Sequence, residues 1–170
     1  MKLVLFALAV VFTTTAAFAQ ESTVLDERRI DRWLVTKLET PSSGLSCQAL
    51  RCNTRTCDNA RTATFFRLWG SARRQAITPM LGADFAYDGV QTAVVDIGER
   101  RFAFEQRVQS TQRLYIAKNA RDDVVIMRLI ANTPSEDIVF RTELGAAAFK
   151  LSGLTDVLAY FTRECGIPRP

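Results

Sequence analysis

The chain has 170 residues, a formal net charge of +4 and no histidine. This length suits one domain, and so mild a charge favours solubility without indicating an anionic partner. Without histidine, Ser-His-Asp and Cys-His catalytic triads are excluded and the commonest metal ligand is missing.

The first nineteen residues have the three parts of a secretory signal peptide. Lys2 supplies the positive charge, residues 3–12 are apolar, and Ala-Phe-Ala at residues 17–19 offers small residues at a cleavage site. The apolar run has about half of the ~20 residues that a membrane-spanning helix needs. We therefore expect residues 1–19 to be removed, although an uncleaved anchor is the alternative. Residues 20–170 then form one periplasmic or secreted domain without a transmembrane segment.

Four cysteines remain after cleavage: Cys47, Cys52, Cys57 and Cys165. An even number of cysteines in an exported chain predicts disulfide bonds, here with three possible pairings. Because the first three lie within eleven residues, at least one of them must pair with Cys165 if all are oxidised. Cysteines spaced in this way, in a chain without histidine, make a poor zinc site, so we expect no metal and no other cofactor.

Alternating, β-branched and aromatic runs recur from residue 32 to residue 117 and favour short strands. The expected strands are residues 32–38, 45–52, 62–69, 90–97, 101–105 and 113–117. Residues 75–81 are a weaker candidate because Pro79 interrupts them. Gly98-Glu99-Arg100 indicates a hairpin turn between two of the strands. The polar residues 20–29 are expected to be mobile, with at most one helical turn.

The pattern changes after residue 118. Asn119 is suited to cap a helix that carries Asp122 and Asp123 in its first turn and ends before Thr133-Pro134-Ser135. This segment is apolar almost all round, so a buried strand is the alternative. Residues 137–143 and 146–151 are then predicted to be a pair of strands.

The last element is the clearest helix, and Gly166 is expected to end it. Its apolar stripe has the i, i+3, i+4, i+7 and i+11 spacing of one helix face: Leu154, Val157, Leu158, Phe161 and Cys165. We expect this face to pack on a sheet with Cys165 against the core. The predicted fold class is α+β, mainly β: a single sandwich-like antiparallel sheet domain with a C-terminal amphipathic helix packed on it.

Few residues are candidates for catalysis. Asp122-Asp123 and Glu136-Asp137 are paired carboxylates that could act as acid and base, but both pairs lie beside a helix end, where acids usually cap or stay solvated. A Ser-Lys pair of Ser152 and Lys150 has nothing to depress the lysine pKa. We therefore expect no catalytic residue.

Arginine accounts for 18 of the 22 basic residues. Its planar group of donors suits carboxylates and phosphates, so the pairs Arg28-Arg29, Arg73-Arg74 and Arg100-Arg101 are where an anion-binding patch would lie. Scattered surface ion pairs are the alternative. Trp33 and Trp69 lie among arginines on predicted strands, as in sheets that bind single-stranded nucleic acid. The export signal argues against that partner, and large aromatics usually belong to the core.

The order of features resembles one known family. An export signal precedes the segment Arg32-Trp33-Leu34-Val35, a loop to Cys47 and a β-rich middle, and the chain ends with Leu151-Ser152-Gly153-Leu154, a helix and Cys165. This arrangement resembles the invasion-associated locus B family of small periplasmic proteins of Gram-negative bacteria. The cysteine pair at residues 52 and 57 departs from the family pattern. The resemblance implies a β-sandwich linked to invasion or envelope functions, with no known catalytic residue to transfer.

Together these features predict a non-enzymatic periplasmic or secreted protein that binds another protein or an envelope component. A hydrolase with paired carboxylates is one alternative. An exported enzyme inhibitor that presents the loop of residues 53–59 is another.

Overall fold

The protein is described by a computed structural model that covers residues 22–41, 44–53, 64–82, 92–109, 112–134, 137–143 and 145–170. The signal-peptide segment, Cys57, Glu136 and residues 54–59 lie outside the described residues. Within them, ten antiparallel strands form one continuous sheet in the order β1-β2-β3-β4-β5-β8-β7-β6-β9-β10. The strands are β1 (Thr23–Ile30), β2 (Trp33–Thr40), β3 (Gly44–Cys52), β4 (Phe65–Ser71), β5 (Ala76–Gly82), β6 (Thr92–Ile97), β7 (Arg100–Gln109), β8 (Gln112–Ala117), β9 (Asp137–Thr142) and β10 (Gly145–Lys150).

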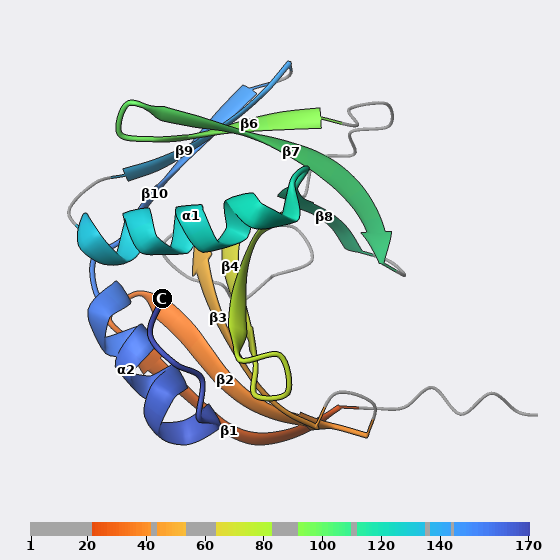
Figure 1. Cartoon of the computed structure of the whole chain (residues 1–170), viewed down its shortest axis with the longest axis vertical. Coiled ribbons are helices and arrows are strands. Elements are labelled where there is room, and N and C mark those ends of the chain that lie inside the picture. The colour runs from red at the N-terminus through yellow and green to blue at the C-terminus, as the bar shows by residue number, and fades with distance from the viewer. Residues whose placement is uncertain are drawn as a thin grey trace, which may run out of the picture.

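The helices α1 (Ala120–Asn132) and α2 (Leu154–Cys165) cover different parts of this sheet. Helix α2 packs against β2, β3 and β4, whereas α1 packs against β5, β6 and β8. Figure 1 shows β6, β7, β9 and β10 running across the direction of β2–β5, with α1 crossing between the two groups. The expected mainly β fold of one antiparallel sheet with a C-terminal helix packed on it is confirmed.

The two parts of the sheet meet at a short junction between β5 and β8. Among the described residues, three pairs join these strands, from Met80 opposite Ile116 to Gly82 opposite Leu114. The expected interruption at Pro79 is wrong, because β5 continues through this residue, which lies opposite Leu68 of β4. The strand tolerates proline here because the pairing with β8 begins only at Met80, so β5 is an edge strand at Pro79.

The expectation that residues 20–29 are mobile, with at most one helical turn, is wrong for most of this segment. Strand β1 pairs with β2 from Thr23 opposite Glu39 to Ile30 opposite Trp33, and neither a mobile segment nor a helical turn is present there. Asp31, with φ of 51°, makes the tight turn between them, a backbone conformation that aspartate tolerates better than most residues. The polar sequence fits because β1 is an edge strand whose side chains are mostly exposed.

The two predicted helices are confirmed. The Asn119 side chain accepts a hydrogen bond from the backbone N–H of Arg121 at 3.1 Å, so α1 begins where the capping signal indicated. All five residues of the predicted stripe on α2 are buried. Among the described helices, none is both long and apolar enough to cross a membrane.

A disulfide bond fastens α2 to the sheet. Cys165 is bonded to Cys47 of β3, which confirms that one of the early cysteines pairs with it. Cys52 is disulfide-bonded as well. Close packing supports the same contact, because a Cβ atom at Gly70 of β4 would lie 2.5 Å from the Ile167 side chain. The end of the chain therefore packs directly on the middle of the sheet.

Candidate functional site

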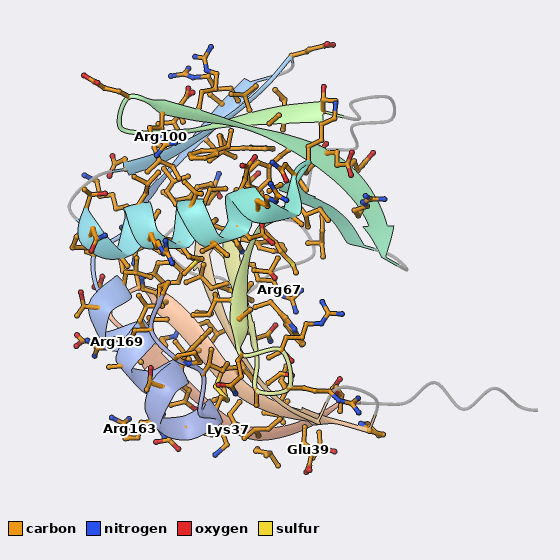
Figure 2. All side chains as sticks on the ribbon, in the orientation of Figure 1. Lys37, Glu39, Arg67, Arg100, Arg163 and Arg169 are labelled. Atoms are coloured by element: carbon orange, nitrogen blue, oxygen red, sulfur yellow. A yellow bond between two sulfur atoms is a disulfide. The ribbon has the colours of Figure 1, made fainter. Side chains whose placement is uncertain are left out.

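The sheet is hollowed on the face that points away from its core. Along β4, Phe66 and Leu68 are buried in the core, so the alternate residues Arg67 and Trp69 face the other way. Figure 2 shows Arg67 beside β4, on the opposite side from α2. Where β4, β5, β7 and β8 meet the first turn of α1, a depression of about 460 Å³ opens, which we call the Arg67 groove. It is lined by Arg67, Trp69, Ser71, Arg74, Thr78, Met80, Arg107, Leu114, Ile116 and Asp123.

Arg67 is a largely buried cation without an acidic partner among the described residues. Its Nη2 donates to Oε1 of Gln48 at 2.7 Å, and its Cζ lies 4.8 Å from the centroid of the Trp69 ring. Its Nε is buried and has no hydrogen-bond partner within the ranges that the structure describes. Burial lowers the pKa of Arg67 to about 10, so the group is still charged at neutral pH. The aromatic ring and Gln48 hold the guanidinium while one of its donors stays unused.

Asp123 lines the same groove and has no ion-pair partner among the described residues. Its Oδ1 is buried and accepts no hydrogen bond from the described part of the chain. Burial raises the pKa of Asp123 to about 6, and the neighbouring charge of Asp122 adds to this effect. No ion pair joins Asp123 to Arg67 in the described part of the chain, although both line the groove. Buried polar groups are nearly always paired in folded proteins, and unpaired ones with shifted pKa values concentrate at functional sites.

The partly buried carboxylate of Asp123 should make stability depend on pH. Between the ordinary pKa of 3.8 and the folded-state pKa of about 6, folded Asp123 binds more protons than the unfolded chain. The contribution of Asp123 to the free energy of unfolding therefore falls as pH rises through this window. We expect Asp123→Asn to be more stable than the wild type above pH 6, with a smaller difference near pH 4. Urea unfolding across this range tests it, and a pH-independent difference would contradict it.

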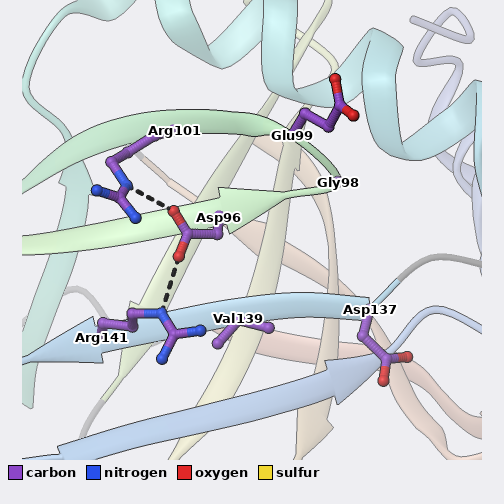
Figure 3. A pocket seen from close by; sticks show the side chains of 7 residues that line it. All are labelled: Asp96, Gly98, Glu99, Arg101, Asp137, Val139 and Arg141. Carbon is purple, nitrogen blue, oxygen red and sulfur yellow. Dashed lines mark hydrogen bonds and ion pairs between the residues drawn. The ribbon is translucent and has the colours of Figure 1, made fainter.

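A second depression lies over β6, β7 and β9 and is different in character (Figure 3). Asp96 accepts hydrogen bonds from Nε of Arg101 at 2.8 Å and from Nε of Arg141 at 2.9 Å. These two bonds, that of Arg101 first, lower the pKa of Asp96. The two arginine side chains are 70% and 56% exposed, so these are solvated ion pairs of low energy. We therefore place the candidate site at the Arg67 groove.

Among the described residues, the two predicted carboxylate pairs do not share one cleft. Asp123 lines the Arg67 groove, whereas Asp137 lines the second depression, and Glu136 lies outside the described residues. The Ser152 hydroxyl donates to Oδ2 of Asp31 at 2.8 Å, which engages it in a contact other than the suggested Ser-Lys pair.

The arginine pairs and tryptophans separate into different roles. Arg28 pairs with Asp26, and Arg101 pairs with Asp96, as the alternative of scattered ion pairs describes. Trp33 is fully buried in the core, while Trp69 lines the groove. Sequence reasoning missed Arg67, although its place two residues before Trp69 on a predicted strand puts both on one face.

The two segments that carry the family resemblance meet in the structure. Trp33 Nε1 donates to the carbonyl oxygen of Ser152 at 2.9 Å. Gly153 has φ of 79°, and a Cβ atom there would lie 2.8 Å from Cβ of Asp31. The segments thus form one structural junction at the start of α2, remote in sequence from the groove residues. No known protein family, curated protein or solved structure matches this chain.

Proposed function

We propose that this chain is an exported binding protein without enzymatic activity, and that it binds its ligand in the Arg67 groove. The observation that carries the proposal is a pair of partly buried, oppositely charged residues, Arg67 and Asp123, which line one groove and have no ion-pair partner among the described residues. Leaving such groups unpaired lowers stability, so a ligand that pairs with them gives a reason for their presence.

Export is supported by the signal-peptide pattern and by the disulfide bond between Cys47 and Cys165. A periplasmic or secreted protein with this groove would capture an envelope component or part of another protein. The resemblance to the invasion-associated locus B family supports an envelope or invasion-associated role.

Binding is favoured over hydrolysis by the composition of the groove. Acid-base hydrolysis by carboxylates requires two of them across the scissile bond. Among the described residues that line the groove, Asp123 is the single carboxylate. The cationic and aromatic groups around it are suited to hold a ligand, and they include no nucleophile activated by a base.

The proposal is tested with the two tryptophans as built-in probes. Trp69 lies in the groove and Trp33 lies in the core. The indole N–H signals of the two residues in an NMR spectrum therefore report on different places. We expect a low-molecular-mass envelope extract to shift the Trp69 signal of the oxidised mature protein and to leave the Trp33 signal in place. Arg67→Met should abolish the shift. Arg101→Met, in the second depression, should retain it. An unshifted Trp69 in the wild type, or an equal shift in Arg67→Met, would contradict the proposal.

A further inference from the structure

We infer that the ligand of the Arg67 groove is a small zwitterion, an amino acid or a short peptide, whose carboxylate binds Arg67 and whose ammonium group binds Asp123. This inference rests on the proposed function and names the class of ligand. It follows from the opposite charges of the two residues, from their partial burial and from their hydrogen-bonding atoms that have no partner among the described residues.

Arg67 provides the site for the carboxylate. Its guanidinium group is fixed between Gln48 and the Trp69 ring, and its Nε donor is unused. A guanidinium group matches a carboxylate in shape and charge, and a partly buried pair is screened less than one on the surface. An anionic group that enters the groove therefore has a preorganised cation to bind.

Asp123 provides the site for the ammonium group. An ionised carboxylate can only accept hydrogen bonds, and no described residue donates one to the buried Oδ1 of Asp123. An ammonium group carries three donors and a positive charge, and would pair with the Asp123 carboxylate where it lines the groove. The charge of the neighbouring Asp122 would favour the same cation.

The decisive point is that both charges belong to one groove and are not joined to each other. A purely anionic ligand would leave Asp123 unpaired and repelled, and a purely cationic ligand would do the same to Arg67. A zwitterion satisfies both groups at once. The volume of about 460 Å³ lies within the range of small-molecule sites, and Trp69, Met80 and Ile116 offer apolar surface for a side chain.

Calorimetry of the oxidised mature protein at pH 7.5 tests the inference with defined probes. The panel holds the twenty common amino acids and their alanyl dipeptides, each beside the matched acid without its amino group and the matched amine without its carboxylate. We expect at least one zwitterion to bind, and its matched acid and amine to bind at least about tenfold more weakly. Arg67→Met and Asp123→Asn should each weaken binding by about tenfold or more. Arg101→Met should leave the affinity unchanged.

The direction of the pH dependence distinguishes the ligand classes. The charged groups that line the groove are Arg67 on β4, Arg74 after it, Arg107 on β7 and Asp123 on α1, with Asp122 beside Asp123. Arg107 is also paired with Glu105. Of the groups whose pKa is resolved, Asp123 is the one that titrates near pH 6. Zwitterion binding should therefore weaken as pH falls from 7 to 5, and Asp123→Asn should remove this dependence.

The opposite result identifies a purely anionic ligand. The inference would be overturned if a matched acid bound as tightly as its zwitterion, if binding became tighter at acidic pH, or if Asp123→Asn bound more tightly than the wild type. The proposed binding function would still stand. The same holds if no member of the panel binds at millimolar concentration while the envelope extract still shifts Trp69. If the extract also has no effect, the proposed function fails with it.

Discussion

Replacing Cys165 by serine is expected to lower the free energy of unfolding by about 4 kcal/mol. The bond between Cys47 and Cys165 spans a sequence separation of 118 residues, so it removes much of the freedom of the unfolded chain. Both cysteines are buried, and the serine hydroxyl would lie in an apolar contact between α2 and β3. Loss of the bond also removes the one covalent link between the described parts of α2 and the sheet.

The measurement is urea unfolding of the oxidised wild type beside Cys165→Ser and the double variant Cys47→Ala/Cys165→Ala. The double variant removes the bond without leaving a free thiol or a buried hydroxyl, so it isolates the covalent contribution. We expect most of the loss in both variants. A change below about 1 kcal/mol in the double variant would contradict the assigned role of the bond.

Replacing Arg51 by alanine is expected to lower the free energy of unfolding by about 3 kcal/mol, because it removes a buried side chain and breaks a partly buried ion pair. Arg51 is 3% exposed and lies 3.3 Å from Oδ2 of Asp31. It also donates to the Ser152 hydroxyl at 3.2 Å, and its Cζ lies 5.9 Å from the centroid of the Trp33 ring. These contacts join the β1–β2 turn, β3 and the start of α2. Because the Asp31 side chain is 42% exposed, water can replace part of the interaction that Asp31 loses. We therefore expect a loss no larger than the lower end of the range for fully buried ion pairs.

Arg101→Ala is the matched control for this prediction. Arg101 also pairs with an aspartate, at 2.8 Å, but its side chain is 70% exposed. We expect it to change the free energy of unfolding by less than about 1 kcal/mol. Equal losses for the two variants would mean that the Arg51 junction is no more important to the fold than a surface ion pair.

Local sequence signals predicted the elements whose determinants are local. The capping residue Asn119 and the acids after it fixed the start of α1, and the apolar stripe with Gly166 fixed α2. Strand β1 was missed because its polar side chains carry no alternation. Its position depends instead on pairing with β2, with Ile30 opposite Trp33. The predicted interruption at Pro79 was wrong for a related reason. Whether a strand tolerates proline depends on where the pairing with the neighbouring strand begins.

The candidate site was predicted less completely than the fold. Asp123 was singled out, but as one of a pair with Asp122, whereas the structure places it in a groove with Arg67. Alternation along β4 puts Arg67 and Trp69 on one face. It does not show that the first turn of α1 reaches the same groove, because that depends on the long-range junction of β5 with β8. Nor does sequence show which charges lack partners, since this depends on every side chain around them.

A double-mutant cycle of Arg67→Met and Asp123→Asn, followed by urea unfolding at pH 7.5, tests most directly whether these two charges stand apart until a ligand joins them. Each single variant should be at least as stable as the wild type, and the two effects should add within about 0.5 kcal/mol. A coupling energy above about 1 kcal/mol, with both single variants destabilised, would instead mean that the two side chains form a salt bridge with each other.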